Sequence, residues 1–176
     1  LQQMENILSS GDVACFIYEP LLLGAGGMLT YSFEALHALT ALCRRYGVLT
    51  IADEVTTGFG RLGPLFASAP FMPDIICMAK GLTGGVLPLA ATACSGPIYD
   101  RFLSQDRSRA LLHGHAYTAN PIACAAALES LHLLRSSACS AQRQRIATHH
   151  QRFLNQVRDH IKIVRSESIG TILILE

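Results

Sequence analysis

Short apolar runs alternate with amphipathic segments along the chain, and this alternation is typical of an α/β protein. Continuous apolar runs of strand length occupy residues 13–18, 48–52, 75–78 and 89–94. Apolar positions at helical spacing predict helices over residues 33–46, 122–135 and 141–158. Strands that are apolar throughout suit a parallel sheet covered on both faces. We therefore expect a mostly parallel sheet with right-handed crossovers and helices on both faces.

The first of these helices has clear start and stop signals. Ser32 can cap its N-terminus, and Glu34 places a negative charge in the first turn, where the helix dipole favours it. Gly47 is expected to end the helix. Asn120 and Pro121 mark the start of the second helix in a similar way.

The pattern divides the chain into two unequal parts. Residues 1–136 contain the predicted sheet and are assigned to a large α/β domain. Residues 137–176 are expected to form a linking helix and the start of a small C-terminal α+β domain, because the apolar run at 172–175 has strand character. The chain begins with Leu1 rather than methionine and ends just after that run, so we expect a piece of a longer polypeptide.

Composition and charge narrow the classes of function. Half of the 176 residues are hydrophobic and 15% are charged, which is enough to bury a sizeable core. The formal net charge is +1, and Lys80 and Lys162 are the only lysines, so the sequence gives no basis for binding nucleic acid. Charges or glycines interrupt every apolar stretch before the roughly 18 residues of a membrane span, so no membrane association is expected.

The cysteines indicate a reducing compartment. None belongs to a C-x-x-C pair, and most lie in apolar runs, so we expect reduced core cysteines rather than disulfides or zinc ligands. The six positions are 15, 43, 77, 94, 124 and 139. The first residues show neither a basic leader nor a hydrophobic signal core. Together these features predict a cytoplasmic protein.

Two polar residues follow predicted strands and form the strongest chemical pair. Lys80 lies between the strand at 75–78 and a glycine-rich run, where a desolvated amine could form a Schiff base with an aldehyde. Asp53 follows the strand at 48–52, and its carboxylate could keep a pyridine nitrogen protonated. Each has a simpler interpretation, since a strand-end lysine can extend to water and an aspartate can cap a turn. The carboxyl ends of parallel strands meet at one edge of a sheet, so the pair together points to pyridoxal 5'-phosphate chemistry there.

Two other motifs are interpreted as loops. Residues 58–63 match G-x-G-x-x-G, but they lie several residues after the strand, Pro64 follows, and the acidic residue expected about 20 positions later is missing. His113 and His115 form one H-x-H pair without a further ligand at suitable spacing, which is weak support for zinc. The pair His149-His150 is expected on a solvated helix face.

Three segments resemble signatures of the class III aminotransferases, which are fold-type I enzymes dependent on pyridoxal phosphate. Residues 53–61 read DEVTTGFGR and match D-E-[VI]-x-T-G-F-G-R. Residues 80–85 read KGLTGG and resemble the segment of the Schiff-base lysine. Glu19-Pro20 followed by residues 24–28 resembles E-P-x-x-x-G-A-G-G. Order and spacing agree as well, and the resemblance covers essentially the whole chain.

The resemblance implies a role for individual residues. Lys80 would form the Schiff base with the cofactor, Asp53 would pair with its ring nitrogen, and Val55 would pack on a face of the ring. Arg61 would lie near the substrate pocket. Glu19 corresponds to a glutamate near the active site of the family.

The resemblance also implies a homodimer whose active site lies at the interface. Gly114, His115 and Ala116 would approach the substrate and the cofactor phosphate of the neighbouring subunit. Class III enzymes usually carry threonine or serine at the position of Ala116, and its hydroxyl binds the phosphate. Ala116 keeps only a backbone N–H for that purpose, and Thr118 could supply a substitute hydroxyl.

Two segments, 24–28 and 113–127, are similar to one branch of the class. That branch transfers an amino group from S-adenosylmethionine to 8-amino-7-oxononanoate and produces 7,8-diaminononanoate in biotin synthesis. Members that act on 4-aminobutyrate, ornithine or other ω-amines share most of the first motifs. A third interpretation is a chain that folds and binds partners but lacks a complete site and is inactive.

Overall fold

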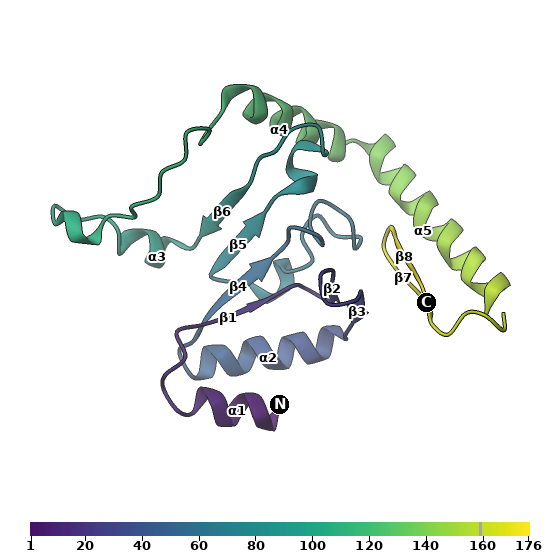
Figure 1. The fold of residues 1–176 in the computed structure, drawn as a ribbon, viewed down its shortest axis with the longest axis horizontal. Coiled ribbons are helices and arrows are strands. Elements are labelled where there is room, and N and C mark those ends of the chain that lie inside the picture. Colours follow the sequence, from purple (N-terminus) through teal and green to yellow (C-terminus); the bar gives the residue numbers. More distant parts are fainter. Residues whose placement is uncertain (159) are drawn as a thin grey trace.

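A computed structural model describes residues 1–158 and 160–176 and shows a central four-stranded sheet (Figure 1). The strand order is β1-β4-β5-β6. Strands β1 (Cys15–Tyr18), β4 (Leu49–Asp53) and β5 (Ile75–Met78) run parallel, and β6 (Ala91–Cys94) joins β5 in the antiparallel direction. The prediction of a mostly parallel sheet is confirmed. All four strand positions are also confirmed, with the first and last strands starting two residues later than expected.

One helix covers a face of this sheet, and a second, shorter helix packs against the first. Helix α2 (Phe33–Arg45) starts as predicted, with the Ser32 side chain accepting a hydrogen bond from the backbone N–H of Ala35 at 3.1 Å. Its fully buried Leu36 packs with Tyr18 and Ala52 of the sheet. Helix α1 (Gln2–Leu8) was not expected, because it is short and mostly polar; its one buried residue, Leu8, packs against α2. Both helices lie below β1 in Figure 1.

The opposite face of the sheet is open at β1 and β4 in the part of the chain that the structure describes. Ile17 is 60% exposed and Leu49 is 40% exposed on this face. All six cysteines are free, but Cys15 on β1 and Cys94 on the exposed edge strand β6 are exposed. The expectation of core cysteines is therefore wrong for these two, because apolar neighbours in sequence do not bury a strand residue whose face of the sheet has no cover. Cys43 alone is fully buried.

The chain after β6 runs along the end of the sheet rather than over that open face. Helix α4 (Pro121–Leu134) packs on the short 3₁₀ helix η2 (Lys80–Thr83), where Phe59, Leu82 and Ala127 form a small core. Helix α5 (Ser137–Val157) follows after two residues and starts four residues earlier than predicted, at the cap Ser136. No helix within the described residues combines the length and apolar character needed to cross a membrane. The remaining short elements are β2 (Leu22–Leu23), β3 (Leu29–Thr30), η1 (Ala69–Phe71), α3 (Gly96–Asp100) and η3 (Arg107–Arg109).

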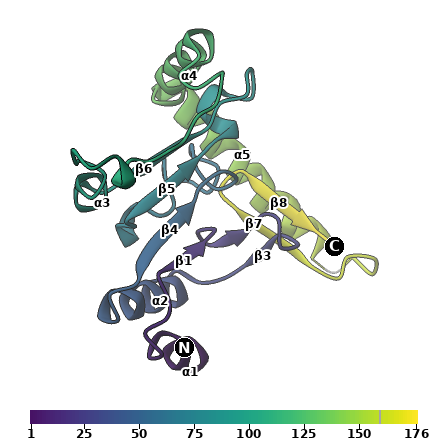
Figure 2. The ribbon, with the colours of Figure 1, turned by 60° about the vertical axis from the view of Figure 1, so that its left-hand side comes forward.

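The C-terminal residues form an antiparallel hairpin of β7 (Ser166–Ile169) and β8 (Ile172–Leu175), which confirms the predicted final strand. The hairpin lies beside α5 (Figure 2), and its buried Ile172 and Ile174 join a core with Leu22 of β2 and with Leu62 and Ala67 of the segment after β4. The N–H of Thr171 donates to the carbonyl of Arg61 at 2.8 Å. A domain boundary near residue 136 stays a prediction.

A buried carboxyl group holds the loop that follows β4. Glu54 is fully buried, and one of its oxygens accepts a hydrogen bond from the Thr57 hydroxyl at 2.6 Å. Its other oxygen accepts from the backbone N–H of Ser68 at 2.6 Å. A buried polar group is stable only when its hydrogen bonds are made, so these two contacts close the loop on itself. Val55, Thr56 and Arg61 lie on the loop fixed in this way.

Glu54→Ala is expected to lower the free energy of unfolding by at least about 1–3 kcal/mol, the cost of one unsatisfied buried donor. It leaves the N–H of Ser68 without an acceptor, and it leaves the Thr57 hydroxyl with only a weak contact to the carbonyl of Asp53 at 3.5 Å. Urea unfolding followed by circular dichroism measures this change. The matched control is Glu5→Ala, which removes an exposed ion pair with Arg45 and should cost no more than about 1 kcal/mol. Equal effects of the two substitutions would show that Glu54 is no anchor.

Candidate functional site

A cavity of about 950 Å³ lies at the carboxyl edge of the sheet. The glycine-rich loop at 24–28, the loop after β4, η2 and α4 form its walls. The predicted site residues Val55, Arg61 and Lys80 line it together. The structure therefore brings residues that are up to 25 positions apart to a single cavity, where the sheet topology predicted a ligand site.

Lys80 has an unusual backbone at the end of this sheet. Its φ is +46°, in the left-handed region that non-glycine residues rarely occupy. The N–H of Gly85 donates to its carbonyl at 3.1 Å and helps to hold this turn. Its Nζ donates to the Thr56 hydroxyl at 3.1 Å. Strained backbone of this kind persists where the surroundings over-determine it, which is common at functional sites.

The Lys80 side chain is exposed, whereas the sequence led us to expect a desolvated amine. The reason is the open cavity. The strand before Lys80 is partly buried, but no group among the described residues covers the amine from the cavity side, so water reaches it.

Asp53 is the last residue of β4 and pairs with Cys77 of β5, three residues before Lys80. One carboxylate oxygen accepts a hydrogen bond from the N–H of Val55 at 3.0 Å, which is the turn-capping contact considered from the sequence. Within residues 1–158 and 160–176 no hydrogen bond to its second oxygen is formed. Asp53 therefore caps the turn and still has one oxygen for another partner.

The loop after β4 packs closely against residues 80–85, which are called the lysine segment below. A Cβ atom on Gly81 would lie 2.8 Å from Cβ of Phe59, so only glycine fits beneath that ring. The hydroxyl of Ser130 on α4 donates to the carbonyl of Gly81 at 3.3 Å from the other side. The lysine segment is thus held between α4 and the loop. Sequence reasoning missed Ser130, although a serine on the mostly apolar α4 helix was a usable signal.

The glycine-rich loop is held by Glu19. One carboxylate oxygen accepts from the N–H of Gly24 at 2.9 Å, and the other lies 3.4 Å from the N–H of Ala25. A Cβ on Gly24 would lie 2.7 Å from the methyl carbon of Thr56. Glu19 therefore fixes one wall of the cavity, and Gly24 allows that wall to approach Thr56.

The second group of predicted residues lies elsewhere. Gly114, His115, Ala116 and Thr118 are exposed, belong to the loop before α4, and do not line the cavity. The Nδ1 atom of His115 accepts a hydrogen bond from the N–H of Tyr117 at 3.2 Å, a contact that shapes the loop itself. The structure thus separates these residues from Lys80 within one chain.

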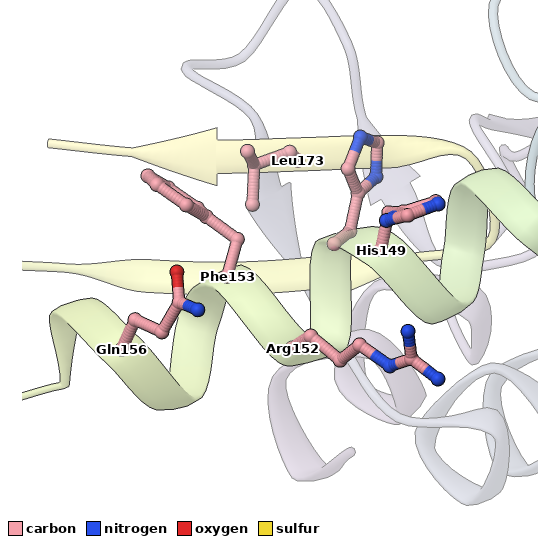
Figure 3. Close-up of a pocket in the computed structure, with 6 residues that line it drawn as sticks. His149, Arg152, Phe153, Gln156 and Leu173 are labelled. Atoms are coloured by element: carbon pink, nitrogen blue, oxygen red, sulfur yellow. The ribbon is translucent and has the colours of Figure 1, made fainter.

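A further hollow of about 450 Å³ lies between α5 and β8. Phe153 and Leu173 face each other across it, and Arg152 and Gln156 of α5 also line it (Figure 3). Of the two histidines expected on a solvated face, His149 is exposed, but His150 is half-buried and its Nδ1 is shielded, because the hairpin covers that side of α5. In the described part of the chain, no three His, Cys, Asp or Glu residues are placed to hold a metal ion.

Comparisons with known proteins agree with the sequence motifs. The family model for class III aminotransferases matches residues 1–176. The chain is 46% identical to adenosylmethionine-8-amino-7-oxononanoate aminotransferase of Synechococcus elongatus over 96% of its own length and 40% of that protein. It is 36% identical to an omega-aminotransferase of Caulobacter vibrioides over its whole length and 40% of that protein.

The structural comparison gives the same result. The crystal structure of adenosylmethionine-8-amino-7-oxononanoate aminotransferase from Methanocaldococcus jannaschii matches with a TM-score of 0.92 at 32% identity, over 99% of this chain and 42% of that one. This chain therefore spans about 40% of the length of these relatives. The fold-type expectation is confirmed, and the chain belongs to the class III aminotransferase family.

Proposed function

We propose that this chain forms part of a transaminase that converts 8-amino-7-oxononanoate to 7,8-diaminononanoate in biotin biosynthesis, with S-adenosylmethionine as the amino donor. The observation that carries the proposal is the placement of Asp53 at the end of β4 and of Lys80 just after the adjacent parallel strand β5, with Lys80 and Val55 on the wall of one cavity. The choice of substrates is supported by the names of relatives that are 46% and 39% identical to this chain.

The residues at the cavity suit pyridoxal phosphate, the cofactor of this family. The cofactor supplies an electron sink when it is bound. Lys80 offers the amine that would hold it covalently, and Asp53 has one carboxylate oxygen free of hydrogen bonds within the described residues. Val55 lines the cavity from the turn that Asp53 caps, which suits it to pack on the ring. The donor set of amine, carboxylate and apolar wall therefore fits the group.

Each of these side chains has a task in the proposed reaction. The Nζ atom of Lys80, once free, would take a proton from the substrate carbon as a base and deliver it, as an acid, to the cofactor carbon that was the aldehyde. The carboxylate of Asp53 holds a proton on the ring nitrogen. Arg61 presents a cation to the substrate from the cavity wall. The glycine-rich loop limits access of water from its side of the cavity.

The loop at 114–118 belongs to a second part of the proposal, a cytoplasmic homodimer. Leu112 is 92% exposed and Tyr117 is 71% exposed, and apolar side chains exposed in this way are typical of an interface. In the dimer, Gly114, His115 and Ala116 would reach the neighbouring subunit's substrate and cofactor phosphate. Ala116 would donate through its backbone N–H, and Thr118 offers the nearby hydroxyl.

A second candidate is another class III ω-aminotransferase. The match to the omega-aminotransferase of Caulobacter vibrioides over the whole chain favours it. Turnover assays distinguish the two candidates. The main proposal expects 7,8-diaminononanoate from S-adenosylmethionine and the keto acid, whereas turnover of 4-aminobutyrate or ornithine in its place would favour the second. A protein that binds the cofactor but turns over none of these would be inactive, and both proposals would be wrong.

The attachment lysine can be tested directly. Borohydride reduction of the protein with bound pyridoxal phosphate, followed by peptide mapping, should place the adduct on Lys80. Lys80→Ala should abolish both the adduct and transamination, because no other lysine lies at the cavity. Lys162→Ala is the matched control and should keep both. An adduct on Lys162 would refute the assignment.

The role of Asp53 predicts a separation between binding and turnover. Asp53→Asn keeps the shape of the side chain but removes the charge that would hold the ring proton. The kcat should fall by orders of magnitude, whereas the Kd of pyridoxal phosphate should change far less, because the charge acts on the transition state. Near-normal turnover of Asp53→Asn would leave the carboxylate with its turn-capping role alone.

A further inference from the structure

Among the described residues, the amine of Lys80 has one hydrogen-bond partner, and it comes from the neighbouring loop. Its Nζ donates to Oγ1 of Thr56 at 3.1 Å, across 24 residues of sequence. Thr56 occupies the position that the signature D-E-[VI]-x-T-G-F-G-R leaves open. The contact therefore belongs to this chain rather than to the motif that it carries.

The surroundings of Thr56 fix the orientation of its hydroxyl. Its methyl carbon faces Gly24, where a Cβ atom would come within 2.7 Å, and Gly24 is held by Glu19. On the other side, Thr57 is anchored to the fully buried Glu54. Because the methyl group occupies the side toward the glycine-rich loop, the hydroxyl is left facing Lys80.

The other hydroxyls on the cavity wall are committed to backbone carbonyls. Thr83 donates to the carbonyl of Leu87 at 2.6 Å, and Ser130 donates to the carbonyl of Gly81 at 3.3 Å. Within the described residues, Thr56 is thus the one hydroxyl on the cavity wall that accepts a hydrogen bond from the lysine amine.

We propose that Thr56 is a positioning residue that holds the free amine of Lys80 whenever the lysine is not attached to the cofactor. This role rests on the proposed function, in which Lys80 alternates between an attached and a free state. A hydroxyl that binds only the free amine stabilises the free state relative to the attached state. Thr56 thus favours release of the lysine, which transamination requires once in every full cycle of two half-reactions.

The first test needs no cofactor. Reductive methylation with formaldehyde and a borohydride reagent, followed by peptide mapping, compares the labelling rates of Lys80 and Lys162, the two lysines of the chain. Thr56→Val should raise the labelling rate of Lys80 relative to that of Lys162 about two- to tenfold, which corresponds to the net free energy of one hydrogen bond. Thr56→Ser should return this ratio to the wild-type value. An unchanged ratio in Thr56→Val, with native circular dichroism, would overturn the proposal.

The second test measures the consequence for the cofactor. Titration with pyridoxal phosphate, followed by its visible absorbance, should show that Thr56→Val binds about two- to tenfold more tightly than the wild type, and that Thr56→Ser binds like the wild type. Thr83→Val is the matched control. It removes a hydroxyl from the same wall without touching Lys80, so it should not tighten binding.

The outcomes separate the two proposals. If the wild type attaches the cofactor at Lys80 but Thr56→Val binds no more tightly, the positioning role is wrong and the proposed function stands. If the wild type attaches no cofactor at Lys80, the proposed function is wrong and the role of Thr56 in it is wrong as well. A stronger effect from Thr83→Val than from Thr56→Val would also overturn the positioning role.

Discussion

Parallel pairing of β1, β4 and β5 is the constraint on which the site depends. Parallel strands end at the same edge of a sheet, and here each strand leads directly into a polar residue: Glu19 after β1, Asp53 at the end of β4, and Lys80 after β5. Asp53 lies in register with Cys77, and Lys80 is the third residue after Cys77. Strand order and register therefore bring these residues to one edge of the sheet. The loops then fix the positions of their side chains.

Close packing between the loops fixes how they are placed around the site. The loop after β4 touches the glycine-rich loop at Thr56, the lysine segment at Phe59 and the C-terminal hairpin at Arg61. In each case the partner is a glycine, since a Cβ atom on Gly24, Gly81 or Gly170 would lie within 2.8 Å of this loop. Three segments thus approach one loop more closely than side chains allow, and buried Glu54 holds that loop from inside. This interlocking explains how Lys80 can keep a left-handed backbone that its own residue type disfavours.

Much of this arrangement could be predicted from the sequence, because its causes are local. The apolar runs identified the strands, Ser32 and Asn120 identified two helix starts, and the parallel topology placed Lys80 near Asp53. Contacts that depend on tertiary approach were missed: Thr56 as the partner of the lysine, Glu54 as a buried anchor and Ser130 behind Gly81. The sequence motif identifies a threonine or a glutamate, but it does not show whether that side chain is buried, hydrogen-bonded or free. Burial of Cys15 and Cys94 was predicted wrongly for a related reason, since an apolar run shows that a strand can be buried but not which face has a cover.

The exposure of Lys80 connects the proposed cofactor site with the proposed dimer. A nucleophilic lysine gains from desolvation, yet the cavity leaves this amine open to water, and its one hydrogen-bond partner in the described part of the chain is a neutral hydroxyl. Two further groups, the cofactor and a neighbouring subunit, would shield the amine from water. The bound cofactor itself would occupy part of the 950 Å³ cavity, and in the proposed dimer the exposed loop at 114–118 of the neighbouring subunit would close another side. On this argument the amine becomes a reactive group only when both are in place, whereas Thr56 holds it in position beforehand. Thr56 positions the lysine, whereas the cofactor and the neighbouring subunit would desolvate it. Because these tasks belong to different groups, the amine would stay accessible to the cofactor until the site is assembled.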